Sequence, residues 1–137
     1  MYQTASRPRA DAYRRIGVET SMHTIDQHQI IVLLYEGLLH EIMRARGALA
    51  RQDVPGKCDA IRRSLRILEE GLMTGLNLEE GGEIAQNLNA LYNYCVHQLV
   101  QANARNDDAL LQEVHSLIES VADGWKAIKQ QAGGAGS

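Results

Sequence analysis

The stretch CDAIRRSLRILEEGLMTGL, residues 58–76, shows the pattern on which the predicted fold rests. Its apolar residues recur at spacings of three and four, which places them along one side of a helix and leaves the charged residues off that side. They are Cys58, Ile61, Leu65, Leu68, Leu72 and Leu76. The segment DVPG (53–56) separates this helix from the one before it. The segment EEGG (79–82) ends it, because glycine readily adopts the positive φ of a helix terminus.

Three further segments carry the same spacing. A first helix begins after Asp26, whose carboxylate can accept hydrogen bonds from free backbone N–H groups, and continues to about Gln52. A third and a fourth helix flank the segment RND (105–107). Their stripes are Ile84, Leu88, Leu91, Cys95, Leu99 and Ala102 in the third, and Leu110, Val114, Leu117, Val121, Trp125 and Ile128 in the fourth.

Long helices joined by breaks of a few residues imply that successive helices run antiparallel. The sequence therefore predicts an all-α fold, an antiparallel up-down-up-down four-helix bundle with an N-terminal arm. We expect residues 1–25 to form a flexible arm, residues 26–131 the bundle, and residues 132–137 a disordered Gly-rich tail. The spacing of Gly71 and Gly75 indicates either a close approach of two helices or a shallow groove for a partner helix.

Composition excludes several classes of partner. Lys and Arg number 14 against 17 Asp and Glu, so the net charge of -3 provides no basic field for nucleic acid. No apolar run reaches the roughly 20 residues of a transmembrane helix, so we expect no membrane insertion. Two cysteines are too few for a disulfide framework, and no signal peptide opens the chain, which together favour the cytosol.

The motifs of metal and cofactor chemistry are missing. A di-metal bundle needs two Glu-x-x-His motifs, and in HEIMR (40–44) Arg44 stands where a zinc protease has its second histidine. We therefore predict no metal, no cofactor, no catalytic residue and no enzyme activity. The alternative is an all-helical phosphotransfer module or an enzyme that uses a polar residue on the bundle surface. His40 or His97 could serve it by position, but neither is followed by a Lys-Gly pair.

The stretch QIIVLLYEGLL (29–39) contains six consecutive apolar or aromatic residues, 30–35. At about 3.6 residues per turn these side chains surround the helix, so one packing partner cannot cover them all. Two explanations stay open at this point. The first helix is either the most central one of the bundle, or it presents apolar surface to a segment from outside.

The chain resembles the FliS family of flagellar secretion chaperones. The similarity runs from Tyr13 to about Trp125 and is carried by AYRRIGVETS (12–21), LLYEGLL (33–39), GGEIAQNLNALYNY (81–94) and QANARND (101–107). Family members commonly begin the first helix with Ser-Pro, whereas Asp26 and Gln27 stand here. The resemblance implies a four-helix cytosolic chaperone that binds the disordered C-terminal region of flagellin and delivers it to the flagellar type III export apparatus. It also implies contacts with the export gate and other flagellar regulators.

Client-binding residues follow from the same resemblance. We expect Tyr13, Ile16 and Val18 to form a removable lid over the client surface. Ile31 and Tyr35 are the candidates on the first helix, and Asn87 can offer its amide to a client backbone. Leu88, Leu91, Tyr92 and Tyr94 are expected to present apolar surface beside it. The alternative for Tyr92 and Tyr94 is that they only seal the edge of the core.

Overall fold

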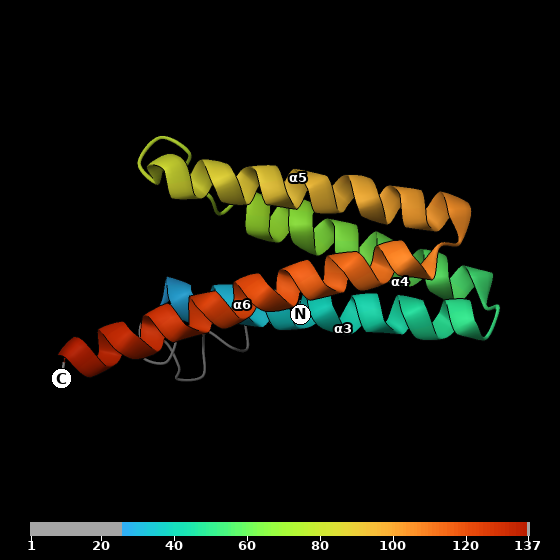
Figure 1. Ribbon diagram of the computed structural model, residues 1–137, viewed down its shortest axis with the longest axis horizontal. Coiled ribbons are helices and arrows are strands. Elements are labelled where there is room, and N and C mark those ends of the chain that lie inside the picture. Colours follow the sequence, from blue (N-terminus) through green and yellow to red (C-terminus); the bar gives the residue numbers. More distant parts are fainter. Residues whose placement is uncertain (1–25, 137) are drawn as a thin grey trace, which may run out of the picture. The chain divides into compact units, whose positions relative to one another are not determined.

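The computed structural model describes residues 26–136, with side chains described to residue 128. All regular elements of this part are helices: α3 (Gln27–Ala50), α4 (Val54–Arg66), α5 (Gly82–Arg105) and α6 (Asp108–Gly136). A π-helical segment, η1 (Ile67–Met73), continues α4 directly. The packing described below lies within one compact unit that begins at Ile31. Successive helices reverse direction (Figure 1), so the predicted antiparallel four-helix bundle is confirmed.

Two helix ends differ from the prediction and others agree with it. α4 begins at Val54, inside the segment 53–56, and its continuation η1 ends at Met73, before the predicted end at residues 79–82. The carboxylate of Asp26 accepts a hydrogen bond from the Gln29 N–H at 2.9 Å, which confirms the predicted cap of α3. Asp53 caps α4 in the same way, accepting from the Gly56 N–H at 3.0 Å. At the end of α5, Asn106 adopts the left-handed conformation with φ of 52°. Asparagine tolerates this conformation better than most residues, so the chain can turn sharply into α6.

Polar side-chain contacts identify the neighbours of each helix. Each helix is joined in this way to two others, and together the contacts place the four helices in a ring. The contacts are Arg44–Asp59 between α3 and α4, Lys57–Asn103 between α4 and α5, Gln98–Glu113 between α5 and α6, and Arg46–Asp108 between α6 and α3.

The core is built from one inward stripe of each helix. Leu38 and Ile42 of α3, Leu99 of α5 and Ile118 of α6 are all fully buried. Burying a side chain of this kind contributes about 1.5–3 kcal/mol, so these stripes are the main source of stability. The core also contains two tyrosines, Tyr35 and Tyr92.

The stripe predicted for residues 58–76 is partly wrong. Cys58 is exposed, whereas Lys57 and Ser64 are buried beside Ile61. Ile61, Leu68 and Leu72 are buried as predicted, and Leu65 and Leu76 pack against the core, so the buried side extends towards Lys57 and Ser64 and excludes Cys58. Both polar residues are buried because each has a partner: the Ser64 hydroxyl donates to the Ala60 carbonyl at 2.9 Å, and Lys57 reaches polar groups of α5.

Gly71 lies where η1 meets α3. A Cβ atom at this position would lie 3.1 Å from Cδ2 of Leu34, so the glycine permits a close approach of the two helices. The close-approach interpretation is therefore confirmed for Gly71. A Cβ atom at Gly75 would meet only the backbone oxygens of Gly71 and Leu72, so the interpretation does not extend to Gly75.

The structure describes the predicted C-terminal end of the bundle but not the predicted N-terminal arm. The predicted arm, residues 1–25, lies outside the described residues. Helix α6 extends to Gly136, beyond the predicted bundle end at residue 131. The predicted disorder of residues 132–137 concerns behaviour in solution and stays a prediction.

Candidate functional site: the outer surface of α5 and α6

One side of α5 borders α6 and combines apolar and amide side chains. Ile84, Leu91 and Gln98 are spaced by seven residues and share this side, as do Asn87 and Tyr94. Tyr94 and Gln98 both reach Glu113 of α6, which fixes the neighbour. Leu117 and Val121 follow Glu113 at spacings of four along α6. We call these residues together the α5–α6 surface: Ile84, Asn87, Leu91, Tyr94, Gln98, Glu113, Leu117 and Val121.

The α5–α6 surface is more exposed than the core beneath it. Ile84 retains 73% of its accessible area and Tyr94 43%. Leu91, Leu117 and Val121 are half-buried against the core. Apolar side chains left partly open in this way are what a partner helix or extended segment requires for docking.

Hydrogen bonds organise the polar part of the α5–α6 surface. The Tyr94 hydroxyl donates to Oε2 of Glu113 at 2.5 Å, and the Gln98 amide donates to Oε1 at 2.9 Å. These two donors lower the pKa of Glu113, and the same bond raises the pKa of Tyr94 because its hydroxyl hydrogen bonds to a carboxylate. Glu113 is therefore an ionised acceptor that holds both neighbours.

Asn87 differs from the other polar residues of the α5–α6 surface. Its side chain is exposed and makes no hydrogen bond within residues 26–136. Both its amide donor and its carbonyl acceptor are therefore open to a partner. Leu88, one residue further on, is half-buried and packs against the core.

Two of the predicted client-binding residues are not at the surface. Tyr35 and Tyr92 retain only 1% and 2% of their accessible areas, so Tyr92 does not present the expected apolar surface and Tyr35 is not exposed to a client. For Tyr92 the alternative, a place at the core, agrees with the structure. Their hydroxyl groups lie 2.5 Å apart and hydrogen bond to each other, which allows both rings to be buried. Ile31 is half-buried against the core. Tyr13, Ile16 and Val18 lie outside the described residues.

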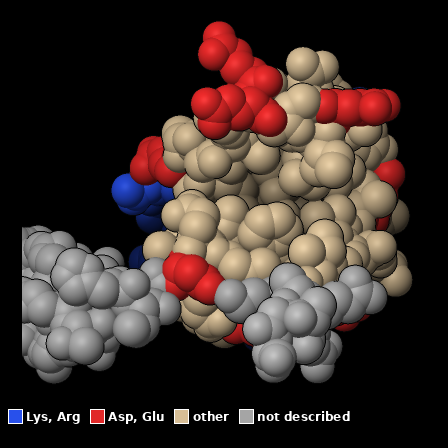
Figure 2. All heavy atoms as spheres, turned by 90° about the vertical axis from the view of Figure 1, so that its left-hand side faces the viewer, with Lys and Arg blue, Asp and Glu red and all other residues tan. Residues whose placement is uncertain are grey.

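The α5–α6 surface continues onto one end of the bundle. Figure 2 views the end at which α5 begins and α6 ends. Side chains other than Lys, Arg, Asp and Glu form most of this face, which has a shallow hollow, and acidic side chains lie along its edge (Figure 2). Leu78, in the segment before α5, is 43% exposed, and Ile84 lies in the first turns of the same helix.

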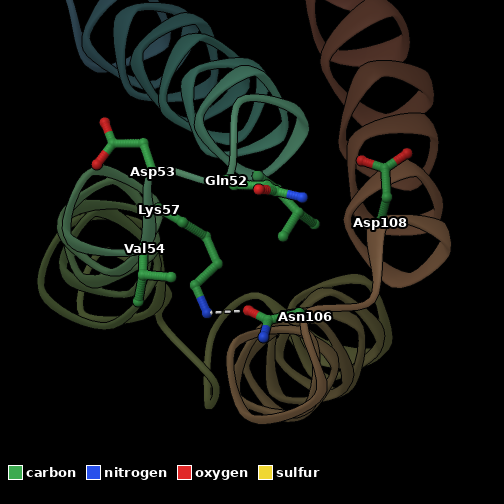
Figure 3. Close-up of a pocket in the computed structure, with 7 residues that line it drawn as sticks. Gln52, Asp53, Val54, Lys57, Asn106 and Asp108 are labelled. Atoms are coloured by element: carbon green, nitrogen blue, oxygen red, sulfur yellow. Dashed lines mark hydrogen bonds between the residues drawn. The ribbon is translucent and has the colours of Figure 1, made fainter.

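A pocket of about 420 Å³ lies at the opposite end, where α3 meets α4 and α5 meets α6 (Figure 3). Lys57 points across it to Asn106 and donates to the Asn103 carbonyl at 2.9 Å (Figure 3). Asp53 caps α4, and Asp108 binds Arg46. Each charged side chain of the pocket already has a partner within the bundle. We therefore interpret these side chains as stabilising the packing of the helix connections, not as a ligand site. Sequence reasoning missed Lys57, because lysine is rarely buried.

Four features of residues 26–136 bear on other kinds of site. No group of three His, Cys, Asp or Glu side chains there could hold a metal ion. His40 and His97, the candidates for a phosphotransfer module, are both exposed. The helices described between residues 26 and 136 include none with the length and hydropathy needed to cross a membrane. Burial raises the pKa of the Cys95 thiol to about 12, so it is not a nucleophile at neutral pH.

Comparisons with known proteins agree on one family. The model of the family described as "Flagellar protein FliS" matches residues 9–132. A flagellar secretion chaperone FliS of Salmonella typhimurium is 40% identical over 121 residues, which cover 88% of this chain and 90% of the relative. The FliS of Escherichia coli is 38% identical over 84% of this chain and 85% of its own length. The chaperone FliSB of Pseudomonas aeruginosa is 39% identical over 85% of this chain and 91% of its own length.

Proposed function

Because the chain belongs to the FliS family of flagellar secretion chaperones, we propose that it binds the disordered C-terminal region of flagellin in the cytosol. Binding prevents premature polymerisation and keeps the client ready for the flagellar type III export apparatus. The protein catalyses no reaction in this role and needs no cofactor. The export gate and other flagellar regulators are further partners under this proposal.

The observation that carries the proposal is the α5–α6 surface. Family membership places the chain among chaperones. The α5–α6 surface offers a client a docking area, because it combines apolar side chains that the bundle itself does not cover with the open amide of Asn87. An amphipathic client segment would bury Ile84 and Leu91 and gain about 1.5–3 kcal/mol for each well-buried apolar anchor. Several anchors offset the cost of ordering a disordered segment.

We assign the predicted client-binding residues accordingly. Asn87, Leu88, Leu91 and Tyr94 are proposed to contact the client from α5, and Ile31 from α3. Tyr35 and Tyr92 support the site from the core and are not proposed to touch the client, because they are almost fully buried. Tyr13, Ile16 and Val18 are proposed to cover part of the same surface until the client displaces them.

A calorimetric and spectroscopic titration tests the proposal. A synthetic peptide of the flagellin C-terminal region is added to the full chain, and circular dichroism and heat are followed over a range of temperatures. We expect a gain of helix and a large negative heat-capacity change, because apolar burial and coupled folding both contribute to it. A matched peptide with its apolar residues replaced by Ser is the control. Absence of heat and of helix gain with the native peptide would refute the proposed function.

A further inference from the structure

Acidic charge is concentrated around one end of the bundle. Residues 67–104 contain five glutamates and no aspartate, lysine or arginine, a net charge of 0 − 5 = −5. The glutamates fall on η1, on the segment before α5 and on the first turn of α5. They are Glu69, Glu70, Glu79, Glu80 and Glu83. Because η1 ends and α5 begins at the same end of the bundle (Figure 1), this charge gathers there.

Most of these carboxylates have no cationic partner. Glu69, Glu79 and Glu83 are exposed and make no ion pair or hydrogen bond within residues 26–136, and Glu80 accepts only from Asn77. Glu70 lies 3.6 Å from Arg66. At the other end of the bundle the situation is reversed, because Asp59 alone is bound by Arg44, Arg62 and Arg63. The negative field around the start of α5 is therefore not compensated within the described structure.

The uncompensated charge borders exposed apolar side chains. Glu79 follows Leu78, and Glu83 precedes Ile84, which is 73% exposed. Glu83 also lies one helical turn before Asn87, on the edge of the α5–α6 surface. An occupant that covers Leu78 and Ile84 removes water from these carboxylates. Removing water from an ionised carboxylate is unfavourable unless a cation or hydrogen-bond donor replaces it.

We propose that residues 78–84 accept a client segment in which Lys or Arg side chains flank the apolar anchors. This inference rests on the proposed function and adds the chemistry of the segment that docks at this end. The apolar anchors cover Leu78 and Ile84, while the basic side chains replace solvent around Glu79 and Glu83. The negative field also accelerates encounter with such a segment, and this acceleration decreases as salt screens the charges.

The test compares two double substitutions that remove the same charge. In Glu79→Gln/Glu83→Gln the two unpaired carboxylates beside the apolar patch are lost. The matched control is Glu119→Gln/Asp123→Asn, which removes two exposed carboxylates of α6 without an ion pair within residues 26–136. Association and dissociation rates of a C-terminal flagellin peptide are measured by stopped-flow fluorescence at about 20 mM and 300 mM NaCl, because the Debye length shortens severalfold over this range.

We expect Glu79→Gln/Glu83→Gln to slow association about three- to tenfold at low salt and to differ little from the unsubstituted chain at high salt. The control should stay within about twofold of the unsubstituted chain at both salt concentrations. Equal rates for all three proteins, or equal slowing by both double substitutions, would overturn the inference while leaving the proposed function intact. A change in oligomeric state without a change in peptide rates would assign the patch to a second copy of the chain and would also overturn it. No binding of the peptide to the unsubstituted chain would refute both proposals.

Discussion

The hydroxyl groups of Tyr35 on α3 and Tyr92 on α5 lie 2.5 Å apart in the core and hydrogen bond to each other. Neither side chain has another hydrogen-bond partner within residues 26–136. Burial raises the pKa of Tyr35. Burial, and to a smaller extent the hydrogen bond to Tyr35, raise the pKa of Tyr92. Both hydroxyls are therefore neutral, and this single bond satisfies two polar groups that are otherwise surrounded by apolar side chains.

Tyr35→Phe and Tyr92→Phe should each lower the free energy of unfolding by about 1–3 kcal/mol, because each leaves the other hydroxyl buried without its partner. The double substitution should be less destabilised than the sum of the two, since it leaves no unsatisfied hydroxyl. Urea unfolding of the four proteins measures the cycle. Additive losses would show that the two hydroxyls do not depend on each other.

The fold could be predicted from the sequence because its information is local. The spacing of apolar residues sets each helix, and Asp26 marks the start of α3 because its side-chain carboxylate accepts a hydrogen bond from the first turn. The rotation of each helix is not local information. Six consecutive apolar residues at 30–35 do not indicate which of them face the core. Packing within the bundle buries Val32 and Tyr35 and leaves Leu33 51% exposed.

The candidate site was predictable only in part for the same reason. Asn87, Leu91 and Tyr94 lie at or near the surface as expected, whereas Tyr92, two residues before Tyr94, lies on the inward side of α5. The sequence places Ile84 in the apolar stripe of α5, yet it is the most exposed large apolar residue described. It occupies the first turns of α5, where the inward side is filled by Ala85. The exposure of a residue at a helix end depends on where the neighbouring helices end. The apolar pattern of a single helix does not show this.

Acidification should destabilise the bundle below about pH 4. Hydrogen bonds from Arg44 and then Arg62 lower the pKa of Asp59 from its ordinary value of 3.8, and Arg46 lowers that of Asp108. A carboxylate whose pKa is lower in the folded state stabilises the fold fully above its unfolded pKa, and this contribution is lost as the pH falls towards the folded value. Urea unfolding between pH 7 and pH 2.5 measures the effect. Asp59→Asn should make the acid dependence shallower, whereas the exposed control Glu119→Gln should not.

Ile84→Ala should weaken flagellin binding with little change in the stability of the free protein. Its side chain is 73% exposed before binding, so its truncation leaves no cavity in the core. The loss of buried apolar area in the complex should raise the Kd about five- to thirtyfold, or roughly 1–2 kcal/mol. Val100→Ala is the matched control, because Val100 is 46% exposed on α5 but lies off the α5–α6 surface. Isothermal titration calorimetry that gives equal losses for both variants would argue against this surface as the docking site.

Asn87→Ala should separate recognition from folding. The Asn87 side chain is exposed and makes no hydrogen bond within the described bundle, so thermal unfolding should be almost unchanged. If its amide hydrogen bonds to the client backbone, the complex should lose about 0.5–1.5 kcal/mol and dissociate faster. Surface plasmon resonance measures the dissociation rate, with Asn93→Ala as a control on another side of α5. A large loss of stability together with unchanged affinity would make Asn87 a structural residue.

Removal of residues 1–20 should tighten or accelerate flagellin binding. These residues include Tyr13, Ile16 and Val18, which we propose to compete with the client for the same apolar surface. When a segment of the chain itself covers the site, only the molecules with an open site can bind the client, and the apparent affinity is reduced in proportion to this fraction. Deletion of the segment removes this reduction. The full chain with Tyr13, Ile16 and Val18 all replaced by Ser should behave like the deletion, because it keeps the length of the segment and removes only its apolar contacts. Stopped-flow association kinetics with a C-terminal flagellin peptide compare the three proteins. Unchanged rates and affinities in both altered proteins would exclude the lid, and slower binding would instead show that these residues contact the client.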